Sequence, residues 1–196
     1  MIRIRSLEVF DEPLLPHFLA IAAHEEEVET VLTNPALAIY VSDWGRDGDC
    51  AVVAENDETS AIVGMAWARF WTPDHQGFGW INELTPEMAV AVEPEFQGRG
   101  IGTRLIEALK CRLRAVSLTV RWDARHQKWV PTSQPVEIEQ PEMRMPTQQL
   151  ALNVRDGSPS VQLYERLGFQ KVAGSERQNR TGGVSFNMLA RLQEGN

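Results

Sequence analysis

Cysteine, histidine and long apolar runs are scarce in this chain of 196 residues. The two cysteines, Cys50 and Cys111, lie far apart, so we interpret them as reduced, buried side chains of a cytoplasmic protein. None of the four histidines has the spacing of a metal site, and no metal is expected. No segment is as long as a membrane-spanning helix and residues 1–13 lack the apolar run of a signal peptide, so neither is expected.

An excess of basic residues is absent as well. The formal net charge of −8 argues against a general nucleic-acid binder, which needs positive side chains to neutralise phosphates. It is compatible with a cationic substrate, although an acidic surface also keeps ordinary proteins in solution. With 43% hydrophobic residues, the chain can build one large core but is short for two domains, so we predict a single domain over residues 1–196.

Strand-like and helical periods alternate along the chain, which predicts an α/β or α+β fold. The expected strands cover residues 2–7, 50–54, 61–71, 87–92, 149–154, 169–173 and 184–192. The expected helices start near Asp11 and cover residues 35–41, 100–114 and 158–167. Asp11 and Ser158 are predicted to cap helices, and Gly168 to be the left-handed residue that ends the last helix.

Residues 117–147 interrupt this alternation. The segment contains several prolines, the tryptophans Trp122 and Trp129, and no clear period, so we predict an irregular insert. Three roles stay open for it: a cap over an acceptor pocket, a partner contact, or a loosely ordered loop.

The stretch EFQGRGIGTRL, residues 95–105, has three glycines between a strand and a helix. The first N–H groups of a helix have no internal partner and carry partial positive charge, so they can bind an anion. Glycines let several of these groups approach one phosphate, and Arg99 and Arg104 would add charge. A plain tight turn is the ordinary alternative. The spacing fits neither a P-loop nor a dinucleotide fingerprint.

Residues 97–102, QGRGIG, are similar to the acyl-CoA-binding signature Gln/Arg-x-x-Gly-x-Gly/Ala of the GNAT superfamily of N-acetyltransferases. A second motif of that family, LYERLGF at residues 163–169, stands on a helix that leads into a strand. On these motifs, the strand AVAVEPEF before them and the order of elements, the chain is identified as a GNAT member over about residues 2–192, apart from the insert.

The resemblance implies a mixed, mostly antiparallel sheet with helices on both faces. The sheet would splay between its fourth and fifth strands, residues 87–92 and 149–154. Acetyl-CoA would lie in this opening, with its pantetheine amides paired to the backbone of Val90, Ala91 and Val92. The signature residues would hold its pyrophosphate, namely Gln97, Gly98, Arg99, Gly100, Ile101, Gly102 and Thr103. Ser158 or Gly157 occupies the place of an asparagine that contacts CoA in relatives, so the chain departs from the family at this contact.

Acetyl transfer to an amine needs a base, a polarised carbonyl and an acid for the leaving thiolate. The resemblance makes Tyr164 the general acid, and the alternative is a tyrosine that only packs or bonds CoA. A backbone N–H near Ala91 or Val92 would polarise the carbonyl. The base is unresolved between Glu83 and Glu87, and either can instead be a surface or hydrogen-bonding residue.

Strand alternation places Glu87 on the face of the strand opposite Met88, Val90 and Val92. If those three side chains face the core, Glu87 faces the other layer. Asn153 stands where some relatives carry a glutamate base, and an amide cannot take that proton.

The aromatic residues after the hairpin have two interpretations. Trp71, Phe78 and Trp80 are expected to pack as core, and the alternative is an acceptor-pocket wall that holds a cationic amine.

The leading hypothesis is an acetyl-CoA-dependent N-acetyltransferase that acetylates a primary amine by direct attack in a ternary complex. No cysteine is placed to form an acyl-enzyme. The acceptor can be a small-molecule or a peptide amine. A second hypothesis is a non-catalytic acyl-CoA sensor on the same fold, and a third is assembly through the insert, with a homodimer left open.

Overall fold

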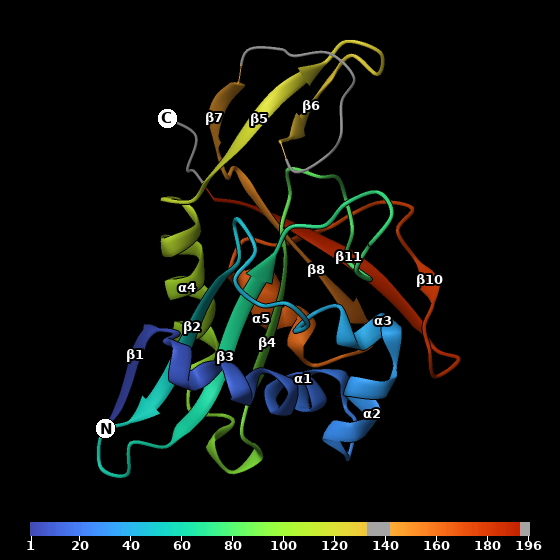
Figure 1. The fold of residues 1–196 in the computed structure, drawn as a ribbon. Helices are drawn as coiled ribbons and strands as arrows, with labels where there is room; N and C mark the ends of the chain where they lie inside the picture. Colours follow the sequence, from blue (N-terminus) through green and yellow to red (C-terminus); the bar gives the residue numbers. More distant parts are fainter. Residues whose placement is uncertain (133–141, 193–196) are drawn as a thin grey trace.

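The computed structural model describes residues 1–132 and 142–192. These residues form an eight-stranded central sheet in the order β1-β2-β3-β4-β8-β11-β10, and β9 pairs with β11 (Figure 1). Its strands are β1 Ile2–Ser6, β2 Cys50–Asn56, β3 Ile62–Arg69, β4 Glu87–Val92, β8 Gln149–Arg155, β9 Gln170–Lys171, β10 Arg177–Gln178 and β11 Val184–Arg191. All neighbours are antiparallel except β4 and β8, which are parallel. The predicted mixed, mostly antiparallel sheet is therefore confirmed.

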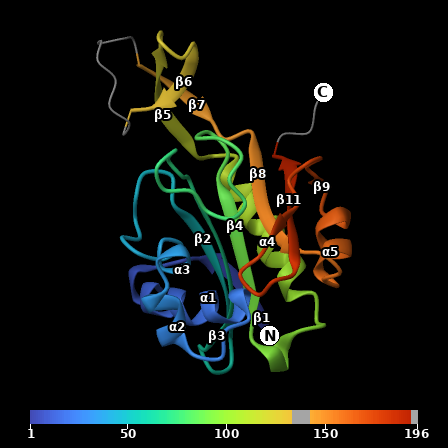
Figure 2. The same ribbon diagram turned by 90° about the vertical axis from the view of Figure 1, so that its right-hand side faces the viewer.

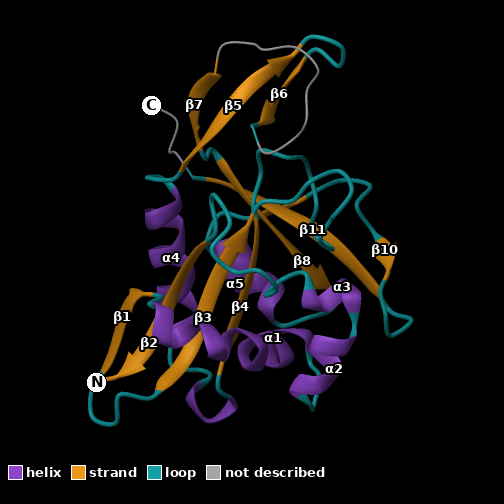
Figure 3. Cartoon of the chain, viewed as in Figure 1, coloured by secondary structure: helices purple, strands orange, loops and turns teal. Residues whose placement is uncertain are grey.

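Helices cover both faces of the sheet (Figures 2 and 3). One face carries η1 Val9–Leu14, α1 Leu15–Ala23, α2 Val28–Thr33 and α3 Pro35–Ala38, and the other carries α4 Ile101–Leu113 and α5 Ser160–Arg166. A short turn, η2 Pro94–Phe96, joins β4 to α4. Within the described ranges no helix is long and apolar enough to cross a membrane.

Strand alternation divides the interior into two apolar layers. In β4, Met88, Val90 and Val92 belong to the layer under α4 and α5. Ala89 and Ala91 belong to the layer under α1, α2 and α3. Residue 87 shares their parity, so it faces the α1 side, as the sequence pattern predicts once residues 88, 90 and 92 face the α4 layer.

Helix α4 packs on the apolar layer that contains Met88, Val90 and Val92. Its buried side chains recur at helical spacing and are Ile101, Leu105, Ile106, Leu109 and Leu113, which confirms the predicted amphipathic face. Lys110 and Arg112 lie in its last turn, where the helix dipole favours positive charge. At the other end, Ile101 and Leu105 pack the start of α4 against the sheet.

The start of the first helical segment differs from the prediction. Asp11 is not an N-cap residue, because it stands third in η1, whose N-cap is Glu8. It is buried, and its carboxylate Oδ2 lies 2.6 Å from Arg5 Nη1 and accepts the Glu8 N–H at 2.8 Å. The charge of Arg5 draws Asp11 inward, so a 3₁₀ turn precedes α1 and Leu14 stands at the N-cap of α1.

The predicted irregular insert is wrong for its described parts. Residues 117–132 and 142–147 contain a three-stranded antiparallel sheet in the order β6-β5-β7, which lies beyond the end of the central sheet (Figure 1). Its strands are β5 Ser117–Asp123, β6 Lys128–Pro131 and β7 Glu142–Pro146. Pro131 and Pro146 end their strands, where a missing N–H costs little. The rest of the insert, residues 133–141, lies outside the described residues.

We expect Leu109→Ala to lower the free energy of unfolding by about 2–5 kcal/mol, because Leu109 is completely buried between α4 and the sheet. Leu32→Ala is the matched control, since Leu32 is 48% exposed on α2, and it should change stability by less than about 0.5 kcal/mol. Urea denaturation of both variants measures this. Equal losses would contradict the assignment of the core.

Candidate active site

The central sheet opens between β4 and β8. Their parallel pairing consists of one register pair, Glu87 with Ala151, and the Ala151 N–H donates to the Pro86 carbonyl at 2.9 Å. Strand β8 is paired along its whole length with β11, and β4 along its whole length with β3. The facing edges of β4 and β8 therefore separate beyond this contact, which confirms the predicted splay.

The unpaired edge of β4 is formed by alternate residues. Glu93 N–H donates to Val63 O at 2.9 Å, so the hydrogen-bonded pairs of the β3–β4 ladder fall on odd-numbered residues of β4. The backbone N–H and C=O groups of Val90 and Val92 therefore point into the opening. The Pro86 carbonyl points the same way, where β4 and β8 meet. Ala91 was predicted to share this role, but its N–H and C=O face Met65 in β3, which corrects the prediction for Ala91.

Glycines at the start of α4 leave backbone amides uncovered. Gly98 and Gly100 have φ values of +73° and +75°, which favour glycine, and a Cβ at either would meet no atom within 4 Å. Gly100 is the N-cap of α4 and no side chain caps the helix. The helix N–H groups thus face open space, as an anion site requires.

The remaining signature residues surround this loop. The Gln97 side-chain amide donates to Val92 O at 2.8 Å, so Gln97 ties the loop to the open edge of β4. Ile101 is buried in the core and contributes its backbone only, while Gly102 and Thr103 are partly buried. Arg99 is exposed and donates to Glu95 O at 2.8 Å, whereas Arg104 donates to Ile2 O at 2.9 Å in β1.

Tyr164 lies on α5 and packs against the same apolar layer as Val90 and Val92. Its ring is partly buried and contacts Phe169 edge-on at 5.9 Å between centroids. Burial raises the pKa of the Tyr164 phenol to about 12, so the hydroxyl remains protonated at neutral pH. Helix α5 ends at the left-handed Gly168 as predicted. It begins at Ser160, and Ser158 accepts the Ser160 N–H at 3.3 Å while Pro159 takes the N-cap position.

Glu87 is a buried carboxyl at the foot of the opening. Its Oε1 accepts the Tyr40 hydroxyl at 2.7 Å, and its Oε2 accepts the Trp71 indole N–H at 2.8 Å. Burial raises the pKa of Glu87 to about 7, although hydrogen bonds from Tyr40, Gly79 and Trp71 favour the ionised form. Burial, followed by the nearby Glu87, also raises the pKa of Tyr40, so Tyr40 stays a donor.

The loop between β3 and β4 encloses this carboxyl. A Cβ at Gly77 would lie 2.2 Å from Glu87 Oε2, and a Cβ at Gly79 would lie 2.7 Å from Glu87 Cδ. The Phe78 N–H donates to the Tyr40 hydroxyl at 2.6 Å, and the Asn187 amide donates to Trp80 O at 3.3 Å. The two glycines are therefore needed for the loop to close over the acid.

Glu83 lies apart from this network. It is 7% exposed and forms an ion pair with Lys128 of the insert. Both residues line a cavity of about 340 Å³ between the loop at Asn82–Thr85 and the insert sheet, together with Trp129 and Gln149. The structure therefore does not bring the two candidate bases together.

The family model for the acetyltransferase (GNAT) domain matches residues 47–171, which is more than half of the chain. The chain belongs to the GNAT acetyltransferase family. No curated protein sequence matches it. Three solved structures illustrate the shared fold of this GNAT chain.

The Escherichia coli ribosomal-protein-S18-alanine N-acetyltransferase is 18% identical with a TM-score of 0.59, covering 100% of this chain and 97% of the other. A phosphinothricin acetyltransferase from Sinorhizobium meliloti, in complex with AcCoA, is 18% identical with a TM-score of 0.61, covering 100% and 90%. A Salmonella typhimurium protein with its cofactor acetyl-CoA is 19% identical with a TM-score of 0.60, covering 100% and 96%.

Some contacts of the candidate site could not be predicted from the sequence of this GNAT chain. Tyr40 follows an ordinary short helix, and no motif marks it as the partner of an acid at position 87. Trp71 was expected as packing or as a wall for a cation, but its indole N–H bonds Glu87. Asn153, which cannot act as a base, donates to Asn187 Oδ1 at 2.9 Å. In the described part of the chain no group of three or more histidine, cysteine or acidic residues could hold a metal.

The stability of this GNAT chain should depend on pH through Glu87. Its folded pKa of about 7 exceeds the ordinary value of 4.5, so the folded state retains a proton that the unfolded state has lost. Relative to Glu87→Gln, which cannot titrate, the wild type should lose about 3 kcal/mol as pH rises from about 4.5 to above 7. Urea denaturation of both proteins across this range measures the difference. A constant difference would contradict the raised pKa.

Proposed function

We propose that this GNAT acetyltransferase uses acetyl-CoA to acetylate a primary amine by direct attack in a ternary complex. The observation that carries the proposal is the open edge of β4 followed at once by the uncovered amides of α4. The first can pair with an extended chain of amides and the second can bind a diphosphate, and acetyl-CoA contains both in that order. Relatives of the same fold with acetyl-CoA support this.

In this proposal the pantetheine arm extends the sheet beside Val90 and Val92, whose backbone groups point into the opening. The pyrophosphate accepts N–H groups of the helix start from Gly98 to Thr103. Gln97 keeps the Val92 carbonyl occupied, which leaves the Val92 N–H for the ligand. Ser158 remains a proposed contact at the start of α5.

The chemistry balances with two proton transfers. The amine nitrogen attacks the thioester carbon, the C–N bond forms, and the C–S bond breaks to give the amide and the CoA thiolate. The Val92 N–H is the proposed donor to the carbonyl oxygen. Tyr164 gives its proton to the thiolate sulfur, and its pKa of about 12 keeps it protonated before that step.

Glu87 is the proposed base, in preference to Glu83. A base works best when its pKa is near the working pH, and the pKa of Glu87 is about 7. Glu83 already balances the charge of Lys128. Because Glu87 is 3% exposed and bonded to the Tyr40 hydroxyl, the amine proton reaches it through Tyr40 or after the loop at Gly77–Gly79 opens.

The enclosure of Glu87 also supports the second candidate, a non-catalytic acyl-CoA sensor on the same fold. A sensor would bind the thioester without releasing CoA, so turnover separates the two.

We further propose a small-molecule or peptide amine as the acceptor and a cytoplasmic location, in line with two cysteines that are both free. A homodimer, and the lack of nucleic-acid and membrane partners, stay predictions.

Gly100→Val should weaken CoA binding at least tenfold, because its side chain would project into the space in front of the α4 amides. Gly182→Val is the matched control. Gly182 has a similar positive φ of +84° and open space around it, but it stands in the turn between β10 and β11, outside the proposed cofactor site, so a valine there adds the same backbone strain without touching the ligand. Titration calorimetry with CoA measures both. Unchanged affinity of a folded Gly100→Val protein would refute the cofactor site.

Tyr164→Phe should lower turnover by about 10²–10⁴-fold while CoA affinity changes little, because it removes the proton donor and keeps the ring. The measurement is CoA thiol release from acetyl-CoA with a panel of small amines and peptides. Release by the wild type and loss in the variant support the transferase. Binding of CoA without release by either protein would favour the sensor.

A further inference from the structure

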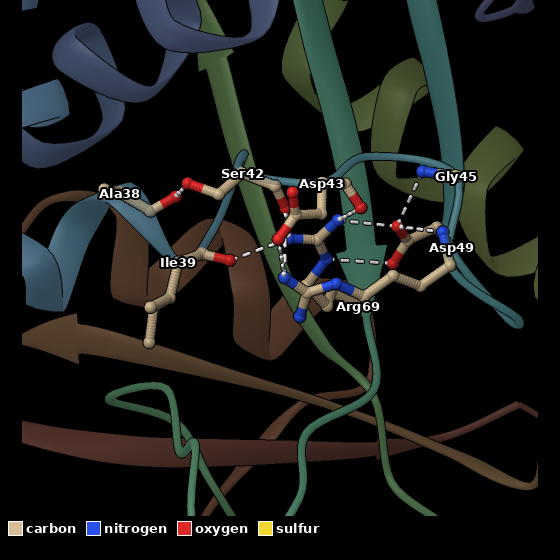
Figure 4. Close-up of polar contacts among 8 residues, drawn as sticks. Ala38, Ile39, Ser42, Asp43, Gly45, Asp49 and Arg69 are labelled. Carbon is tan, nitrogen blue, oxygen red and sulfur yellow. Dashed lines mark hydrogen bonds and ion pairs between the residues drawn. The ribbon is translucent and has the colours of Figure 1, made fainter. Parts of the chain in front are cut away.

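Arg69 of β3 is the most completely paired charged side chain near the proposed base. It is 1% exposed, and its guanidinium makes five hydrogen bonds (Figure 4). Nε and Nη2 donate to the two carboxylate oxygens of Asp49 at 2.9 and 2.6 Å. Nη1 donates to Ile39 O at 2.7 Å and Ser42 O at 2.6 Å, and Nη2 to Asp43 O at 3.2 Å. All five N–H donors of the arginine are therefore occupied.

Asp49 is also buried, and its carboxylate is fully used by hydrogen bonds to Arg69 and to the turn before β2. Its side chain is 3% exposed, and its Oδ2 also accepts the N–H groups of Gly45 and Arg46 at 3.0 Å each (Figure 4). The charges of Arg69 and Asp49 thus cancel inside the turn that follows α3.

The position of Arg69 makes this pairing notable. Arg69 is the direct partner of Glu87 in the β3–β4 ladder. Residues opposite each other on antiparallel strands have side chains on the same face and Cα atoms about 5.5 Å apart when they are hydrogen-bonded. An arginine there would ordinarily pair with the glutamate and lower its pKa. Here the hydrogen-bond donors to Glu87 are uncharged, namely Tyr40, Trp71 and the Gly79 N–H.

The carbonyls that bind Arg69 also fix Tyr40. Ile39 lies immediately before Tyr40, and Ser42 and Asp43 follow closely after it. The Tyr40 hydroxyl in turn lies between Glu87 Oε1 and the Phe78 N–H. Arg69 therefore anchors the backbone on both sides of the residue that contacts the acid.

We propose that the Arg69–Asp49 pair positions Glu87: Asp49 binds and balances the charge of Arg69, so that it does not pair with the carboxyl, and Arg69 holds the backbone around Tyr40, whose hydroxyl donates to Glu87. This rests on the proposed function, in which Glu87 accepts the amine proton. Asp49 then keeps Glu87 a suitable proton acceptor by balancing the charge of Arg69, although it does not touch Glu87.

Among residues 1–132 and 142–192, the groups packed around Glu87 are mostly uncharged. From the segment after α3 comes Tyr40, and from β3 come Arg69 and Trp71. The β3–β4 loop contributes the backbone of Gly77–Gly79, and β8 contributes the backbone of Ala151 and Leu152. Arg69 is thus the cation whose position sets how strongly the ionised form of Glu87 is stabilised. The pKa of Glu87, about 7, agrees with a cation that does not pair with it.

The test is Asp49→Asn, which keeps the shape of the side chain and removes the charge that holds Arg69. We expect the pKa of Glu87 to fall by about one unit, because the charge of Arg69, its partner in the β3–β4 ladder, is then no longer balanced by a carboxylate. The readout is NMR titration of carboxyl-¹³C-labelled glutamate in the intact chain, with Glu87→Gln to assign the signal. The acidic limb of kcat/KM against pH should shift to lower pH by the same amount.

Asp43→Asn is the matched control. It removes the same charge from the same turn, but the Asp43 side chain is 87% exposed and its contact with Arg69 is through the backbone carbonyl. It should leave the Glu87 titration unchanged. A Glu87 pKa that stays constant in folded Asp49→Asn, or that moves equally in Asp43→Asn, would overturn the proposal.

A second variant decides the question if Asp49→Asn does not fold. In Arg69→Met combined with Asp49→Leu, the buried pair is replaced by apolar side chains, which proteins often tolerate. Tyr40 then loses its anchor and Glu87 loses a donor, so the pKa of Glu87 should rise rather than fall. An unchanged value would contradict the positioning role. Because NMR titration needs no turnover, a failed proposed function would appear separately, as a normal titration shift without thiol release.

Discussion

The parallel contact between β4 and β8 is the constraint on which the site depends. It is reduced to one register pair at Glu87 and Ala151, and the strands diverge from there. Both strands are fully paired on their outer sides, so neither can close the gap. The gap leaves the N–H groups of Val90 and Val92 without a neighbouring strand to pair with, which is costly unless water or a ligand satisfies them. The glycine loop and α4 begin where this open edge ends. The N–H groups at the start of α4 therefore follow directly after those of Val90 and Val92.

The same contact places Glu87 where burial controls its chemistry. The carboxyl lies at the foot of the gap, shielded by the Gly77–Gly79 loop and by Tyr40. Burial raises the pKa of Glu87, and hydrogen bonds from uncharged donors partly offset this increase, so the pKa is about 7. The opposing arginine is neutralised in the turn at Asp49. Electrostatics around the acid is therefore set by a turn that is remote in sequence from β4.

Local periodicity and motif spacing predicted much of this arrangement. The bounds of β4, the apolar face of α4, the glycine turn and Gly168 follow from short-range patterns that survive folding. The contacts of Glu87 could not be predicted, because Tyr40 is 47 residues away and only the fold brings them together. Ala91 was grouped with its neighbours because the ladder register, which decides where its N–H points, is a property of the pair β3–β4. Strands β6 and β7 of the insert were missed because they are short and end in proline, whereas β5 has the alternating apolar residues Leu118, Val120 and Trp122, a signal that the prediction overlooked.

The two free thiols differ in a way that matters for handling the protein. Cys50 is buried in β2, and burial raises the pKa of its thiol, so it should resist alkylation. Cys111 is exposed on α4, so the prediction that both cysteines are buried is wrong for Cys111. Ellman-type reagents would therefore titrate about one equivalent per folded chain before any substrate is added. The same asymmetry makes Cys111 a unique attachment point for a fluorophore or spin label on the helix whose first turn borders the gap.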